Sequence, residues 1–211
     1  MNALPRLHAV TDARILALPD LVERAARLAA GGGAALAIHV RDHALPARTL
    51  LAHARLLGAV ARDAGALLVV NARADVARAA GAAGLQLGKH DLSPAEARAV
   101  LGSGWGGGIG VSVHTAAEAT AAIAADADWL VLGNVFPTAS HPGRPGLGLA
   151  ALRDVSRGRR PVIAIGGITP ASATELHRAG AYGLAAISAL WDAVDPAAAA
   201  TAMLAPWREA A

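Results

Sequence analysis

The sequence contains no cysteine, and only 3% of its 211 residues are aromatic. Without cysteine the chain has no disulfide, no thiol nucleophile and no thiolate metal site. No uncharged apolar run approaches the roughly 18 residues that a membrane span needs. The first residues also lack the basic-then-apolar pattern of a signal peptide. We therefore expect a cytoplasmic protein with no membrane partner.

An excess of charge is also lacking. Nineteen basic and 16 acidic side chains leave a formal net charge of +3. The arginines are scattered, apart from a small cluster at Arg157, Arg159 and Arg160. A nucleic-acid-binding protein usually gathers its basic side chains on one face. The sequence therefore predicts no nucleic-acid partner.

Short apolar runs, which are typical of buried strands, alternate along the chain with helical stretches. The expected strands are Leu7–Val10, Ala35–Val40, Leu67–Val70, Gly84–Leu87, Gly108–Ser112, Trp129–Leu132, Pro161–Ile165 and Gly183–Ile187. The expected helices are Pro19–Ala30, Ala47–Ala64, Asp75–Ala80, Pro94–Leu101, Thr115–Ala125, Leu149–Val155, Pro170–Ala179 and Pro196–Leu204. Eight strand–helix units in a chain of this length favour a (β/α)₈ TIM barrel that forms a single domain over residues 1–211. An open, doubly wound parallel sheet is the alternative.

The stretch Pro161–Thr169 has the pattern of a phosphate-binding turn. An apolar strand ends at Gly166 and Gly167, which can adopt positive φ and bring backbone N–H groups close to a ligand. Thr169 and Pro170 then suit the start of a helix. A strand, two glycines and a helix N-terminus together favour an anion site, although a plain tight turn without a ligand fits the same residues. Ser188, after the eighth strand, adds a hydroxyl where barrels often bind phosphate.

Polar residues gather after the other predicted strands, which is where TIM-barrel enzymes place their chemistry. They include Arg41, Asn71, Gln86, Lys89, Asp91, Ser112, His114, Thr138, Ser140 and His141. Residues 133–148 form a long loop, rich in glycine and proline, which could cover a substrate. This clustering predicts an enzyme.

The ordered motifs resemble the thiamin phosphate synthase/TenI superfamily over nearly the whole chain. They are LHAVTD at residues 7–12, IHVRD at 38–42, LVVNARADVA at 68–77, LQLG at 85–88, IGVSVHT at 109–115, LGNVFPT at 132–138, VIAIGGITP at 162–170 and AISAL at 186–190. The resemblance implies a (β/α)₈ barrel of thiamin biosynthesis that binds a small thiazole phosphate, and a homodimer is plausible for this family.

The TenI branch, which comprises the thiazole tautomerases, is the main prediction. Its members convert a carboxythiazole phosphate tautomer into the aromatic isomer by moving a proton, and they need no metal or other cofactor. Imidazole can both accept and donate a proton near neutral pH. The residue that matches the catalytic histidine of this branch is His114.

The remaining site residues are assigned to binding. The guanidinium of Arg41 can bind a carboxylate or phosphate bidentately, or instead pair with Asp12 or Asp42. Asn71 can orient the substrate or hold its own loop, and Lys89 can supply a second cation. The predicted substrate-binding residues are Arg41, Asn71, Gln86, Ser112, Thr138, Ser140 and Lys89, and the predicted phosphate-binding residues are Gly166, Gly167, Ile187 and Ser188.

The synthase branch is the alternative. Its members couple a pyrimidine pyrophosphate to a thiazole phosphate, with Mg²⁺ on the pyrophosphate. The aspartate that should follow Asn71 is Ala72, and lysines expected near 43 and 141 are His43 and His141, whereas the metal-holding Asp91 is present. A non-catalytic thiazole or thiamin phosphate binder is a third reading. His8 and His39 are expected to pack or hydrogen-bond, and His90 has no assignment.

Overall fold

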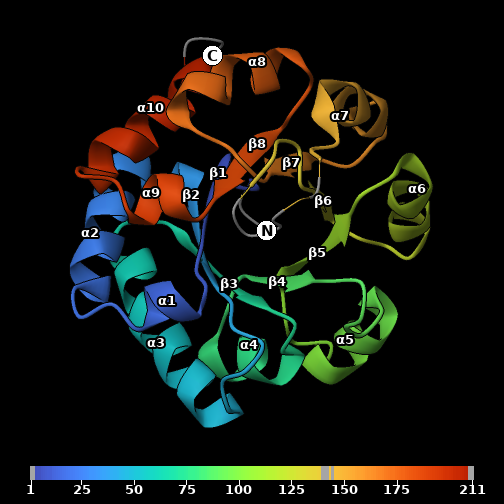
Figure 1. Ribbon diagram of the computed structural model, residues 1–211. Helices are drawn as coiled ribbons and strands as arrows, with labels where there is room; N and C mark the ends of the chain where they lie inside the picture. Colours follow the sequence, from blue (N-terminus) through green and yellow to red (C-terminus); the bar gives the residue numbers. More distant parts are fainter. Residues whose placement is uncertain (1–2, 139–142, 144, 209–211) are drawn as a thin grey trace.

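Eight parallel strands close into a barrel in this computed structural model, which describes residues 3–138, 143 and 145–208 (Figure 1). Neighbouring strands follow one another along the chain, and β8 pairs with β1, so that the sheet has no open edge. The strands are β1 Leu7–Val10, β2 Leu36–Val40, β3 Leu67–Asn71, β4 Gly84–Leu87, β5 Gly108–Val113, β6 Trp129–Leu132, β7 Val162–Ile165 and β8 Gly183–Ala186. The TIM-barrel prediction is confirmed, and the open-sheet alternative is wrong.

The helices surround the barrel (Figure 1). They are α1 Ala13–Leu16, α2 Leu21–Gly32, α3 Ala47–Asp63, α4 Ala74–Ala80, α5 Pro94–Leu101, α6 Ala116–Ala124, α7 Gly148–Ser156, α8 Ala173–Arg178, α9 Ser188–Trp191 and α10 Pro196–Arg208, with short 3₁₀ turns at Gly33–Ala35 and Pro170–Ser172. One predicted helix start is wrong by two residues, and another is confirmed with a 3₁₀ turn as its first part. The helix expected from Pro19 begins at Leu21, and the one expected from Pro170 begins as a 3₁₀ turn.

Two apolar clusters hold the barrel together. The larger one lies between the sheet and the helices, because every strand sends alternate side chains outward. The smaller one fills the barrel interior and includes Val69, Trp129 and Ile163. Gly110 leaves room for the indole of Trp129, since a Cβ at this position would overlap it.

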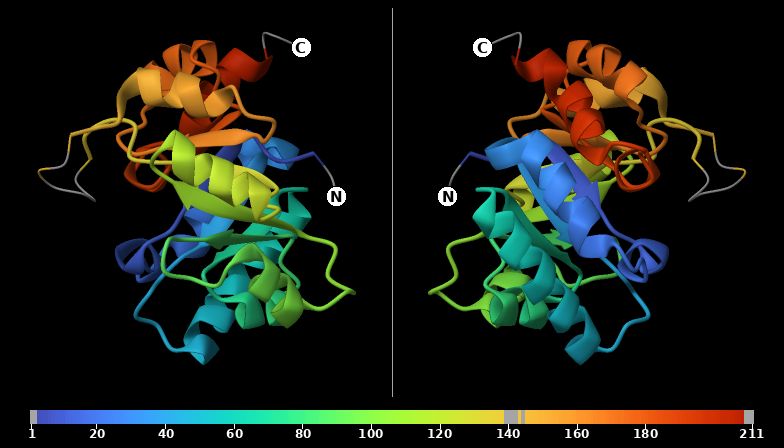
Figure 2. Two further views of the ribbon diagram at one scale, coloured as in Figure 1. Left: turned by 90° about the vertical axis from the view of Figure 1, so that its right-hand side faces the viewer. Right: turned by 90° about the vertical axis from the view of Figure 1, so that its left-hand side faces the viewer.

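The carboxyl ends of all eight strands point to one end of the barrel, because every pair is parallel. The chain that leaves β6 extends from this end, opposite the first described residues (Figure 2). Loops from eight strands therefore converge on one face, which positions the candidate site. No helix among the described residues combines the length and apolarity needed to cross a bilayer.

Candidate active site

A cavity of about 820 Å³ opens at the carboxyl ends of the strands. Every predicted site residue that the structure describes lines it: Arg41, Asn71, Gln86, Lys89, Asp91, Ser112, His114, Thr138, Gly166, Gly167, Ile187 and Ser188. Ser140 and His141 lie outside the described residues. The cavity brings the other predicted residues together, whereas their individual roles stay predictions.

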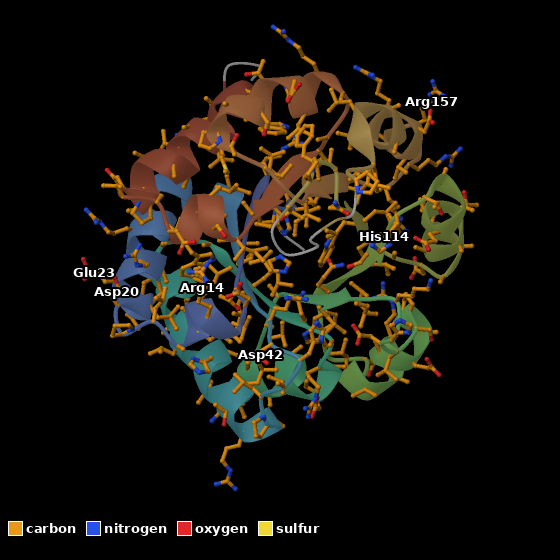
Figure 3. The ribbon with its side chains drawn as sticks, in the orientation of Figure 1. Arg14, Asp20, Glu23, Asp42, His114 and Arg157 are labelled. Carbon is orange, nitrogen blue, oxygen red and sulfur yellow. The ribbon has the colours of Figure 1, made fainter. Side chains whose placement is uncertain are left out.

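His114 lies just beyond β5, at the start of α6 (Figure 3). One carboxylate oxygen of Glu118 accepts hydrogen bonds from the His114 backbone N–H at 2.6 Å and from its Nδ1 at 3.3 Å. These bonds, the backbone one first, lower the pKa of Glu118 and keep it ionised. The carboxylate orients the imidazole and leaves Nε2 available for proton transfer. Half of the His114 side chain is exposed.

Arg41 follows β2, with its backbone held by Thr11. The Arg41 N–H donates to the Thr11 hydroxyl at 2.9 Å. The carboxylates that could have neutralised the guanidinium bind backbone instead: Asp12 caps α1 through the Ile15 N–H, and Asp42 accepts from the N–H groups of residues 44 and 45. Within the described part of the chain Arg41 therefore has no ion-pair partner and can bind an anion in the cavity.

Gln86 serves the barrel more than the cavity. Its Oε1 accepts from the Trp129 indole N–H at 2.9 Å, and its Nε2 faces Ser112 Oγ at 3.1 Å and the Leu87 carbonyl at 3.3 Å. The side chain is nearly fully buried. Both N–H groups of Gln86 are directed at protein acceptors, although the residue lines the cavity. Its predicted role in substrate binding stays a prediction.

Two buried histidines form the floor of the cavity. His8 Nδ1 lies 2.7 Å from His39 Nε2, and His39 Nδ1 lies 3.0 Å from the Asn71 side-chain oxygen. Burial lowers the pKa of His8 to about 4, and burial followed by repulsion from His8 lowers the pKa of His39 well below 6.5. Both imidazoles are therefore neutral at pH 7. Sequence reasoning expected hydrogen bonds here, but it could not pair two histidines that are 31 positions apart.

The glycine pair after β7 has the predicted backbone, with φ of +98° at Gly166 and +65° at Gly167. The Gly166 carbonyl accepts from the Phe136 N–H at 3.0 Å, so this turn is bonded to the chain that leaves β6. Ile187 precedes α9, and Ser188 is the first residue of that helix. The turn after β7 and the start of α9 thus line the same side of the cavity.

Acidic side chains near the β3 and β4 ends are few. Asp91 accepts from the Gly88 N–H at 2.6 Å, which leaves lone pairs on its carboxylate. Ala72 follows Asn71 with a φ of +65°, a left-handed conformation that aspartate and asparagine tolerate better than alanine. The described residues contain no group of three or more histidine or acidic side chains that could enclose a metal.

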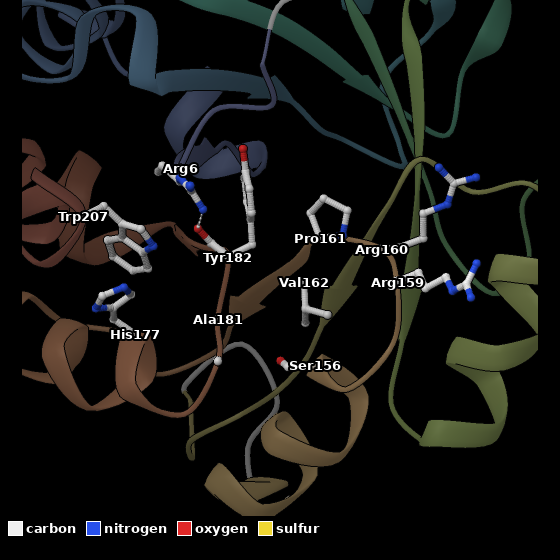
Figure 4. A pocket seen from close by; sticks show the side chains of 11 residues that line it. Arg6, Ser156, Arg159, Arg160, Pro161, Val162, His177, Ala181, Tyr182 and Trp207 are labelled. Atoms are coloured by element: carbon white, nitrogen blue, oxygen red, sulfur yellow. Dashed lines mark hydrogen bonds between the residues drawn. The ribbon is translucent and has the colours of Figure 1, made fainter. Parts of the chain in front are cut away.

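A second cavity, of about 580 Å³, lies near the amino ends of β7 and β8 (Figure 4). The arginines that line it are bonded to other protein groups or point away from its aromatic side chains. Arg6 donates to the Tyr182 carbonyl at 2.8 Å and stacks on its ring, while Arg160 pairs with Asp126. In Figure 4 the head groups of Arg159 and Arg160 point away from Tyr182 and Trp207. The arginines of this cavity therefore do not converge on a common point where they could bind an anion.

Comparison with known proteins decides the family. The model of the family described as "Thiamine monophosphate synthase" matches residues 7–190. The chain belongs to this family. It is 46% identical over 180 residues to the thiamine-phosphate synthase of Methanoculleus marisnigri, covering 84% of each chain. It is 41% identical over 206 residues to that of Salinispora arenicola, covering 97% of this chain and 98% of the relative.

A solved structure titled thiamine phosphate pyrophosphorylase from Pyrococcus furiosus superposes with a TM-score of 0.83 and 32% identity, covering 97% of this chain and 96% of the other. The superfamily prediction and the thiamin-biosynthesis prediction are supported. The names of the relatives favour the synthase alternative over the tautomerase branch, which was the main prediction.

Proposed function

We propose that this member of the thiamine monophosphate synthase family is a thiamin phosphate synthase, which couples a pyrimidine pyrophosphate to a thiazole phosphate. The observation that carries the proposal is that one cavity presents two separate sets of groups for anions. Arg41, His43 and Lys89 come from the ends of β2 and β4, whereas Gly166 and Ser188 come from β7 and β8. Two phosphorylated substrates need two such sets. Relatives that are 41–46% identical and named thiamine-phosphate synthase support the assignment.

The donor set fits a magnesium ion that arrives on a pyrophosphate. Mg²⁺ commonly takes one or two protein carboxylates and fills its other positions with phosphate oxygens and water. Asp91 supplies one carboxylate, and it lines the cavity together with Gly88, from whose N–H it accepts a hydrogen bond. When bound, the ion would neutralise charge on the leaving pyrophosphate. With Ala72 in place of a second carboxylate, its affinity rests on Asp91 and the substrate.

The residues of the chain itself position the two substrates. The Arg41 guanidinium, which pairs with no carboxylate of the described residues, would hold pyrophosphate oxygens bidentately. Backbone N–H groups at Gly166 and Gly167 and the Ser188 hydroxyl would hold the thiazole phosphate. Binding both substrates in one cavity aligns the two reacting atoms and removes most of the entropic cost of their encounter.

The test is Mg²⁺-dependent pyrophosphate release when both half-molecules are supplied. We expect release that needs both substrates and falls at least tenfold in Arg41→Met, which keeps the length of the side chain. Arg48→Met, on α3 outside the cavity lining, is the matched control and should keep full activity. No release at saturating Mg²⁺ would exclude the synthase.

A thiazole tautomerase is the second candidate, because a specific observation favours it. His114 lines the cavity and is hydrogen-bonded to the ionised Glu118, which is the arrangement of an acid–base catalyst. The missing carboxylate at Ala72 also weakens metal binding but does not affect proton transfer. The proton would leave the thiazole ring carbon for His114 Nε2 and return to the exocyclic carbon.

This candidate predicts conversion of the carboxythiazole phosphate tautomer without metal. His114→Ala should lower the rate by about 10² to 10⁴, the usual contribution of one acid–base group. Glu118→Gln, which keeps the shape of the side chain, should lower it less. Equal rates in wild type and His114→Ala would exclude this role. Ligand binding by calorimetry without turnover in either assay would leave only the non-catalytic binder.

A further inference from the structure

His8 and His39 link the amino end of the barrel to the cavity through an unbroken series of contacts. The Pro5 carbonyl lies 3.1 Å from His8 Nε2, His8 Nδ1 lies 2.7 Å from His39 Nε2, and His39 Nδ1 lies 3.0 Å from the Asn71 side chain. Neither imidazole reaches solvent appreciably, with 0% and 2% of their surface exposed. Each of these three hydrogen bonds therefore needs a proton on one of the two protein atoms that it joins.

The Pro5 carbonyl fixes the direction of the series, because it can only accept a hydrogen bond. His8 Nε2 must carry a proton to donate to it. A neutral His8 then has a bare Nδ1, which accepts from a proton on His39 Nε2. A neutral His39 in turn has a bare Nδ1, and this lone pair faces Asn71.

The orientation of the Asn71 amide follows from a count of protons. If its oxygen faces His39, both ends of the series need a donor, and the two imidazoles must share three N–H protons and a positive charge. A neutral pair has two. If the proton of each imidazole moved to its other nitrogen, His39 could donate to the Asn71 oxygen. The bare Nε2 of His8 would then face the Pro5 carbonyl, which cannot donate a hydrogen bond. The amide of Asn71 can turn, since its oxygen and nitrogen occupy nearly the same space.

We propose that the His8–His39 pair is a positioning device that turns the Asn71 NH₂ group toward His39 and its carbonyl oxygen into the cavity. In this orientation the amide NH₂ group of Asn71 is bonded to His39, and its carbonyl oxygen is the group that Asn71 presents to a ligand as a hydrogen-bond acceptor. The ligand group that it recognises is an N–H or O–H donor. Burial supports the neutral pair, because no carboxylate of the described residues is bonded to either imidazole and could stabilise a buried imidazolium.

The protonation of two buried histidines thus decides which ligand group Asn71 can bind. This inference rests on the proposed function only in taking the cavity as the ligand site. The test uses ligand-free protein, so its failure and the failure of the enzyme assays are distinguishable.

The first measurement is ¹⁵N NMR of the histidine side chains in the wild-type protein at pH 7. We expect His8 and His39 to be neutral, with the proton on Nε2 in both. An Nδ1–H tautomer or an imidazolium at either residue would overturn the proposal. Because this measurement needs no variant, it holds even where a substitution fails to fold.

The second measurement uses Asn71→Asp. A carboxylate cannot donate to His39 Nδ1, so His39 must take up a second proton, and its pKa should rise by more than one unit. Asn134→Asp is the matched control, because Asn134 also lines the cavity but donates to the Phe136 carbonyl and does not contact His39. No rise in Asn71→Asp, or an equal rise in Asn134→Asp, would contradict the proposal.

Discussion

Ala72 has a backbone conformation that suits a different residue. Its φ of +65° lies in the left-handed region, which costs a non-glycine residue about 1–2 kcal/mol. Aspartate and asparagine tolerate this region because their short polar side chains can hydrogen-bond locally. The position directly follows the cavity-lining Asn71 and donates its N–H to the Gln86 carbonyl on β4, the strand that leads to Asp91. It is also the position at which the family resemblance places a second carboxylate.

Ala72→Asp should therefore strengthen magnesium binding without loss of stability. We expect the Mg²⁺ concentration for half-maximal pyrophosphate release to fall at least tenfold, since a second carboxylate joins Asp91. Ala72→Asn keeps the backbone preference without the charge and should leave the Mg²⁺ requirement unchanged. An equal effect of both variants would show that the charge is not responsible.

Single residues also show what a sequence can reveal. Gly166 and Gly167 were predictable because a strand, two glycines and a helix start lie next to one another in the chain. The partner of His114 was not predicted, although Glu118 follows at the helical spacing of four residues. The ion-pair alternatives for Arg41 could not be decided, because they depended on whether Asp12 and Asp42 were already bound to backbone N–H groups.

At the scale of elements, Gln86 ties three neighbouring strands together inside the barrel. It lies on β4, donates to Ser112 on β5 and accepts from Trp129 on β6. Strand boundaries were predictable to within one or two residues from apolar runs and glycines. The hydrogen bonds by which Gln86 joins the strands could not be predicted, because they depend on register and on which side chains face inward.

Gln86→Met should destabilise the fold by about 1–3 kcal/mol, because the buried Trp129 N–H loses its acceptor. Urea unfolding would measure the loss. In a Trp129→Phe background the same substitution should cost at least 1 kcal/mol less, since no orphaned N–H remains. Equal costs in the two backgrounds would mean that the hydrogen bond contributes nothing.

At the scale of the whole molecule, the buried histidine pair makes stability depend on pH. The unfolded chain protonates His8 near its ordinary pKa of 6.5, whereas the folded chain holds that pKa at about 4. Between these values the unfolded state binds more protons, so stability falls as the pH is lowered. His39, with its pKa shifted in the same direction, adds to this fall.

Lowering the pH from 7 to 5 should therefore cost about 2 kcal/mol from His8 alone. Urea unfolding at the two pH values would measure it. His8→Phe should reduce the pH dependence by about half, while His53→Gln, on α3 and outside the pair, should retain it. A wild-type protein equally stable at both pH values would contradict the buried neutral pair.

The barrel itself was the most predictable property, because eight alternating units leave few topologies for a chain of this length. The choice between synthase and tautomerase could not be predicted in the same way, since the two branches share the barrel and differ at a handful of positions such as Ala72.

The close fit of the β7 turn against the segment after β6 has a practical consequence for mutagenesis. An added methyl group at Gly166 would collide with Asn134, and one at Gly167 would collide with Phe136 and the Pro137 carbonyl. Alanine at either glycine would thus distort a second loop of the cavity as well as the turn that carries it. Ser188→Ala removes only a hydroxyl, and so it is the cleaner way to separate anion binding from the architecture around it.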